Sequence, residues 1–256
     1  MKLIPLPAFS DNYLWLWHDG QSAVVVDPGD AGPVREALLQ HQLSLVAILV
    51  THHHADHVGG VADLRAATGA TVYGPAGEAI PEPCHPCQQG DVLHLLGQSV
   101  HVMDVPGHTA GHVAYWLPDA AGGPVLFCGD TLFSAGCGRV FEGTPAQMLA
   151  SLDALARLPG ETRICCAHEY TLSNLKFAHA VEPDNLEIEK YTSECKTIRA
   201  RNEPTLPARL ERERAINPFL RVREPSVVAA AQRLHPEAHD PVAVFAALRQ
   251  WKNDFR

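Results

Sequence analysis

One loop constrains this chain of 256 residues more than any other feature: residues 51–57 read THHHADH. The loop follows the short apolar run of residues 46–50, which is typical of a strand buried on both faces. Its candidate metal ligands are His52, His54, Asp56 and His57. Because so many ionisable groups repel one another when protonated and are costly to desolvate, a bound metal would stabilise them. The loop therefore indicates a metal centre, whereas isolated histidines elsewhere are interpreted as ordinary surface or core residues.

Three more candidate ligands each follow a predicted strand. They are His108 in VPGHTAGH, Asp130 in FCGDTLF and His168 in CCAHEYT. Loops at strand ends are where a rigid sheet can bring together side chains from distant parts of a sequence. The resulting seven residues are enough for two metal ions. His53 and His112 are not needed as ligands, and we expect them to support the site from behind or simply to pack.

Strand and helix patterns alternate through the first two thirds of the chain. The predicted strands are residues 12–17, 22–27, 46–50, 71–74, 92–96, 100–105, 113–117, 125–128 and 163–166. The predicted helices are residues 33–41, 58–67 and 144–158. The last of these begins with a capping box, in which Thr144 is the cap, Pro145 follows it and Gln147 closes the box. This alternation predicts an α/β fold.

Beyond residue 170 the strand patterns stop and helical spacing takes over. One helix face is marked by Ile188, Tyr191, Cys195 and Ile198. Further helices are predicted at about 208–216, 225–235 and 241–252, the last one starting at Asp240 and Pro241. We therefore predict two domains, a metal-binding catalytic domain at residues 1–168 and a helical domain at residues 169–256.

Charge and cysteine content exclude several classes of protein. A net charge of -9 argues against a nucleic-acid surface, and no apolar run reaches the roughly 18 residues of a membrane span. Pro5, Pro7 and Asp11 interrupt the first apolar stretch before a signal-peptide core could form.

Seven cysteines, an odd number, fit reduced thiols, and Cys84 and Cys87 lack the second pair that a zinc site needs. We expect a cytoplasmic monomer that acts on a small molecule.

The order and spacing of the metal motifs carry a resemblance to a known family. THHHADH, GHTAGH, CGDTLF and AHEYT resemble the metal motifs of the metallo-β-lactamase superfamily. The resemblance implies an αββα sandwich, and it implies that Asp27 in VDPGD braces the metal loops. It also implies that one metal is bound by His52, His54 and His108, the other by Asp56, His57 and His168, and that Asp130 bridges the two. Zinc is the expected metal, although iron or manganese also suits such ligands.

Four further segments narrow the resemblance to the glyoxalase II family. They are CGRVFEGT at 137–144, HEYTLSNLKFA at 168–178, NPFLR at 217–221 and LRQWKNDF at 248–255. The resemblance implies hydrolysis of S-2-hydroxyacylglutathione thioesters, such as S-D-lactoylglutathione to D-lactate and glutathione, the second step of methylglyoxal detoxification. A metal-bridging hydroxide would attack, held by Asp56 and Asp130. The implied glutathione site consists of Arg139, Phe141, Tyr170, Asn174, Arg249 and Lys252, where Phe141 replaces the tyrosine of some members.

The residues themselves agree with this substrate. Arg249 and Lys252 share one face of the last predicted helix in an otherwise acidic chain, which suits the carboxylates of glutathione. A thiol with a pKa of about 8.5 leaves as a thiolate without a protein acid. Two alternatives remain open at this stage: a hydrolase of another thioester or lactone, and a metal-binding or redox module without hydrolytic activity. A shell of histidine and aspartate favours an open catalytic centre over the latter.

Overall fold

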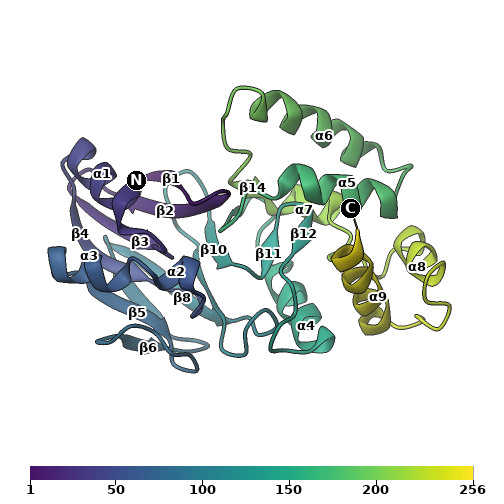
Figure 1. Ribbon diagram of the computed structural model, residues 1–256, viewed down its shortest axis with the longest axis horizontal. Coiled ribbons are helices and arrows are strands. Elements are labelled where there is room, and N and C mark those ends of the chain that lie inside the picture. The colour runs from purple at the N-terminus through teal and green to yellow at the C-terminus, as the bar shows by residue number, and fades with distance from the viewer. Residues whose placement is uncertain (256) are drawn as a thin grey trace.

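The computed structural model describes residues 1–255 and consists of four layers (Figure 1). Two six-stranded sheets pack face to face, and helices cover the outer side of each sheet. This arrangement confirms the expected αββα sandwich. Among the described residues, no helix is both long and apolar enough to cross a lipid bilayer.

The first sheet has the strand order β1-β2-β3-β4-β5-β6. Its strands are β1 Lys2–Ala8, β2 Asn12–His18, β3 Ser22–Val26, β4 Ser44–Leu49, β5 Thr71–Pro75 and β6 His85–Cys87. Helices α1 Ala31–His41, α2 Ala55–Val58 and α3 Val61–Thr68 belong to the same half of the sandwich. The sequence patterns missed β1 because it contains Pro5 and Pro7. Both prolines are tolerated because β1 is an edge strand of the sheet.

The predicted helix 58–67 is replaced by two pieces, α2 and α3, that are separated at Gly59 and Gly60. The backbone of the VDPGD turn lies directly against this break. A Cβ atom on Gly60 would lie 2.6 Å from the carbonyl oxygen of Pro28, and one on Gly29 would lie 1.8 Å from that of Asp56. Only glycine permits this contact, which seats the metal loop on the end of β3.

The second sheet has the strand order β14-β13-β10-β9-β8-β7. Its strands are β7 Val92–Leu95, β8 Gln98–Asp104, β9 Val113–Leu117, β10 Val125–Gly129, β13 Arg163–Cys166 and β14 Ala208–Arg209. A small hairpin, β11 Leu132–Phe133 with β12 Gly136–Cys137, follows β10. Helix α4 Pro145–Leu155 has both hydrogen bonds of the predicted capping box. The expectation that strands stop after residue 170 is wrong at β14, which pairs with β13.

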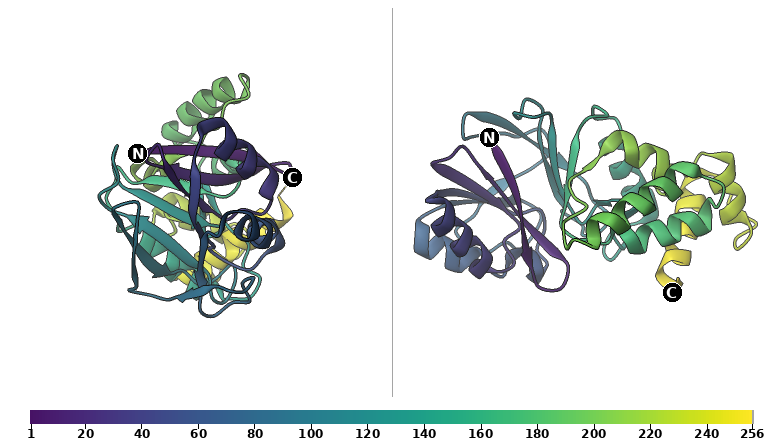
Figure 2. Two further views of the ribbon diagram at one scale, coloured as in Figure 1. Left: turned by 90° about the vertical axis from the view of Figure 1, so that its left-hand side faces the viewer. Right: turned by 90° about the horizontal axis from the view of Figure 1, so that it is seen from above.

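Among the described residues, the C-terminal third contains five helices besides the short strand β14. They are α5 Thr171–Val181, α6 Leu186–Arg199, α7 Leu210–Ile216, α8 Pro225–Gln232 and α9 Pro241–Asp254. In the right-hand view of Figure 2 these helices lie at one end of the sandwich, beside the second sheet. The largest hydrophobic cluster continues from between the sheets into them, through Tyr115, Phe127, Phe177, Phe219 and Phe245. The helices therefore share a core with the second sheet, and a domain boundary at residue 168 stays a prediction.

Candidate metal centre and substrate pocket

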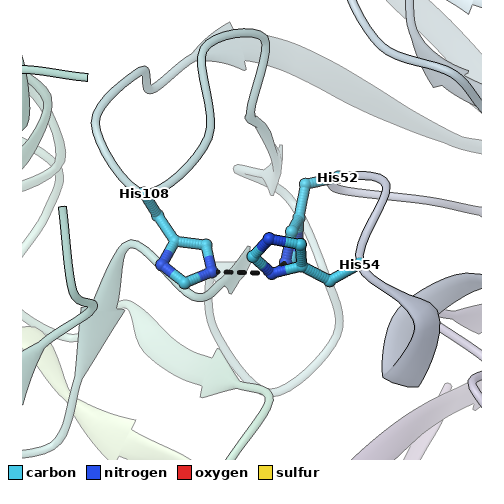
Figure 3. Close-up of side chains that lie close together, drawn as sticks. All are labelled: His52, His54 and His108. Atoms are coloured by element: carbon cyan, nitrogen blue, oxygen red, sulfur yellow. Dashed lines mark hydrogen bonds between the residues drawn. The ribbon is translucent and has the colours of Figure 1, made fainter. Parts of the chain in front are cut away.

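The seven predicted ligands come together in space at the ends of four strands. The side-chain donor atoms of His52, His54 and His108 lie within 4.8 Å of one another, and so do those of Asp56, His57 and His168. We call these groups the first cluster and the second cluster. Figure 3 shows the rings of the first cluster converging, with His54 Nδ1 3.1 Å from His108 Nε2.

Asp130 lies between the two clusters. Its Oδ2 is 3.4 Å from His108 Nε2 in the first cluster, and its Oδ1 is 3.4 Å from His168 Nε2 in the second. Within the described residues, Asp130 Oδ1 and His57 Nε2 are buried without a hydrogen-bond partner. Buried polar atoms that face one another in this way are what a bound cation would satisfy. The donor set therefore fits two divalent ions that share one carboxylate.

Asp130 and His57 shift each other's pKa values in the absence of a metal ion. Burial would raise the pKa of Asp130, but His57 and His168 hold it below its usual range. Burial would lower the pKa of His57, but Asp130 and Asp27 raise it to about 9. His57 thus carries positive charge that offsets the carboxylates, whereas burial lowers the pKa of His52 and His108. Divalent cations can take over the role of His57.

The ligands are oriented by partners behind them. Asp27 accepts hydrogen bonds from the Thr51 backbone and hydroxyl, both at 2.7 Å, and lies 3.1 Å from His57 Nδ1, as expected for a brace. His112 also acts from behind, because its Nε2 accepts the backbone N–H of Asp130 at 3.2 Å.

Two supporting residues escaped the sequence analysis. Asp11 Oδ1 lies 2.8 Å from His168 Nδ1, and Asn12 donates to Asp56 Oδ2 at 2.9 Å. These contacts join residues 157 and 44 positions apart, so no local spacing signals them.

A cavity of about 520 Å³ opens from this centre towards α5 and α9. His108 and Asp130 line its inner end. All six candidate substrate residues also line it: Arg139, Phe141, Tyr170, Asn174, Arg249 and Lys252. The structure thus brings the predicted substrate residues and two predicted ligands into one cavity.

The six residues present different chemistry to the cavity. The ring of Tyr170 stacks on His168 with centroids 4.7 Å apart, and Phe141, with 60% of its surface exposed, points its ring towards His108. Burial, together with Arg249 and Arg139, lowers the pKa of Lys252 to about 8. Aromatic side chains therefore lie near the metal centre, whereas cationic groups lie on the side of α9.

Two of the six also hold the β11–β12 hairpin, a contact that sequence reasoning missed. Arg249 is buried and donates to the carbonyl of Cys137 at 2.9 Å, and Asn174 donates to that of Ser134 at 3.0 Å. From α7, Glu213 accepts the backbone N–H of Ala135 at 2.6 Å. The C-terminal helices thus shape the wall of the cavity as well as lining it.

Comparison with known proteins agrees with this geometry. The family described as "Metallo-beta-lactamase superfamily" matches residues 6–83 and 86–168, and "Hydroxyacylglutathione hydrolase C-terminus" matches residues 169–255. Together with the αββα fold and the two clusters, the first match makes the chain a member of the metallo-beta-lactamase superfamily.

Individual relatives narrow the assignment. The hydroxyacylglutathione hydrolase of Albidiferax ferrireducens is 62% identical over 255 residues and covers 100% of both chains. The structure of ETHE1 from Myxococcus xanthus shares the fold, with a TM-score of 0.66, 24% identity and 100% of both chains covered. TTHA1623, solved in a di-iron-bound form, is 34% identical with a TM-score of 0.54, over 66% of this chain and 92% of its own. The chain belongs to the hydroxyacylglutathione hydrolases, the glyoxalase II family.

Proposed function

We propose that this enzyme hydrolyses the thioester bond of S-2-hydroxyacylglutathiones, with S-D-lactoylglutathione as a substrate and D-lactate and glutathione as products. One observation carries the proposal: a single cavity connects His108 of the first cluster and the shared Asp130 with the cationic side chains of α9. The 62% identity over the full length to a protein named hydroxyacylglutathione hydrolase supports the same substrate. The reaction is the second step of methylglyoxal detoxification.

The metal is inferred from the donor set. The two clusters and Asp130 offer imidazole nitrogens and carboxylate oxygens, which zinc accepts readily and iron or manganese also accepts. We infer two zinc ions, and elemental analysis of the purified protein tests this. When bound, such ions lower the pKa of a water from 15.7 to about 7 and polarise a carbonyl oxygen.

Side chains of the protein would position the metal ions and the substrate. Asp130 and Asp56 would hold the metal ions that activate the attacking water, and Asn12 fixes the Asp56 carboxylate by its hydrogen bond. Phe141 and Tyr170 flank the metal end of the cavity, where the short acyl group would lie. Glutathione leaves as a thiolate with a pKa of about 8.5, so no side chain has to supply a proton to it.

Lys252 provides the sharper test of the glutathione site, because Arg249 also supports the hairpin. Its amine is charged below a pKa of about 8 and neutral above it. A carboxylate bound by this half-exposed group contributes about 1 kcal/mol, so Lys252→Ala should raise KM about fivefold and leave kcat unchanged. The KM of the wild type should rise as the pH passes 8, and the KM of the variant should not. Lys190→Ala, on the exposed surface of α6, is the matched control.

The decisive comparison uses a thioester that lacks the glycine end of glutathione. It should be a poor substrate for the wild type and should be almost insensitive to Lys252→Ala. Equal rises in KM towards both thioesters would remove the glutathione assignment. The enzyme would then be a hydrolase of another thioester or lactone in the same superfamily.

We further propose that the enzyme works in the cytoplasm as a monomer. All seven cysteines are free thiols, and six of them are buried, which suits a reducing compartment. Size-exclusion chromatography with light scattering tests the oligomeric state, and a mass near twice 27.8 kDa would contradict it.

A further inference from the structure

One buried carboxylate joins the two loops of the first cluster without being a ligand. Glu78 lies between β5 and β6, and its side chain is 2% exposed. Its Oε2 accepts the backbone N–H of His53 at 2.6 Å and lies 2.9 Å from His53 Nδ1. Its Oε1 accepts the backbone N–H of Gly111 at 3.0 Å and the hydroxyl of Thr109. Glu78 therefore binds the loop of His52 and His54 with one oxygen and the loop of His108 with the other.

A second carboxylate extends this connection through the same histidine. Glu142 Oε1 lies 3.3 Å from His53 Nε2, and Glu142 Oε2 accepts the backbone N–H of Ala110 at 2.8 Å. Both ring nitrogens of His53 thus face carboxylates of other loops. His53 therefore links these loops through both of its ring nitrogens.

We propose that Glu78, acting through His53, is a positioning residue that sets the affinity of the first cluster for its metal ion. The inference rests on the proposed two-metal centre. His52 and His54 flank His53 on one loop, and His108 immediately precedes Thr109 on the other. The separation of these two loops sets the distance between the histidine nitrogens that would bind the first ion. A carboxylate that clamps both loops keeps the ligands at that distance before the ion arrives.

The second cluster does not depend on Glu78. Its residues are oriented by Asp27, which follows β3, by Asp11 in the β1–β2 turn and by Asn12 at the start of β2. Loss of Glu78 should therefore act on one ion only. Outer residues that orient metal ligands typically change metal affinity by about 10- to 100-fold.

Glu78→Gln is the informative substitution because it keeps the volume and replaces one acceptor oxygen with a donor. The glutamine amide has one acceptor oxygen, but it faces the backbone N–H groups of both His53 and Gly111. At least one of these N–H groups must therefore lose its acceptor. We expect two zinc ions still to bind in a competitive chelator titration, one with unchanged affinity and the other weakened by about 10- to 100-fold. Glu82→Gln, an exposed position of the same connection, is the matched control and should leave both affinities unchanged.

A double-mutant cycle identifies which ion is affected. In a His54→Ala background, where the first cluster is already broken, Glu78→Gln should weaken the remaining ion by less than about twofold, whereas its effect should persist in full in an Asp56→Ala background. Should Glu78→Gln fail to fold, His53→Gln, at a partly exposed position, replaces it in the same cycle. Equal weakening of both ions, or no change in either, would overturn the positioning role. A wild type that binds no pair of ions would instead refute the metal centre itself.

Discussion

Asp130 lies between the two clusters of candidate metal ligands, yet the groups behind these clusters differ in charge. In the first cluster, His108 Nδ1 donates to the backbone carbonyl of Arg139 at 2.9 Å, and His52 Nδ1 lies 3.0 Å from the Thr51 hydroxyl. In the second, carboxylates stand behind both histidines: Asp27 behind His57 and Asp11 behind His168. A carboxylate behind a ligating histidine raises its basicity and its affinity for a cation. Similar donor sets thus predict unequal sites, with the second cluster binding more tightly.

The largest effect should follow from removing the residue that the clusters share. Asp130→Ala deprives both ions of a ligand, so metal content and activity should fall together. Loss of several kcal/mol of transition-state stabilisation corresponds to a decrease in kcat/KM of about 10³-fold or more. Elemental analysis and a thioester assay measure both quantities. Retention of two ions with near-normal turnover would show that Asp130 does not bridge the clusters.

The next effect ranks the clusters directly. His54→Ala should leave the tighter second cluster intact and retain about one ion per chain after dialysis. His57→Ala should retain less, because it breaks the cluster that binds more strongly and leaves the weaker one. Metal content per chain after dialysis against the same buffer gives the order. The reverse order would refute the ranking of the two sites.

A smaller effect is expected at the carboxylate behind His168. Asp11→Asn keeps an acceptor for the ring but removes the charge, so the affinity of the second ion should fall by about 10- to 100-fold. The first ion should be unaffected, which makes this variant the mirror image of Glu78→Gln. Chelator competition measures both affinities. A change at the first ion instead would show that the two clusters are not independently supported.

The smallest effect concerns the thiols. Neither cluster contains a cysteine, so alkylation should leave both ions bound and most of the activity intact. Burial raises the pKa of Cys87 to about 12, and Cys84 is the most exposed of the seven. Cys137 is the exception to watch, because it lies on the cavity wall beside Arg249. Loss of metal on alkylation would mean that a thiolate contributes to one cluster.

The clustering of the seven candidate ligands could be predicted because each lies in a compact motif directly after a buried strand. The residues that support them could not, since their burial depends on partners far along the chain. Glu78 sits in a proline-rich segment without periodicity, and its interior position depends on contacts with His53, Thr109 and Gly111 in other loops. Glu213 lies in the run LERERAI, which has the composition of a solvent-exposed helix, yet its side chain is fully buried.

Helix α5 and strand β14 are among the elements that escaped the sequence analysis for similar reasons. Helix α5 directly follows a metal motif, and its start at Thr171 has no side-chain cap to mark it. The two-residue strand β14 becomes visible only through its pairing with β13. Local patterns thus define long periodic elements and ligand motifs, whereas short elements and connecting contacts depend on the assembled fold.

The contacts between the β11–β12 hairpin and the C-terminal helices have a consequence for how the cavity can evolve. Ala135 at the tip of the hairpin adopts a φ of 55°, a conformation that is unfavourable for a residue with a side chain and that Glu213 stabilises by accepting its N–H. Helices of the C-terminal third therefore support the hairpin, α7 through Glu213 and α5 through Asn174. Recombination that transferred those helices to another αββα scaffold would transfer the cavity residues of the helices. It would not transfer the β11–β12 hairpin that these helices support. The hairpin and the helices therefore form one structural unit of the cavity wall, and a change in one requires a matching change in the other.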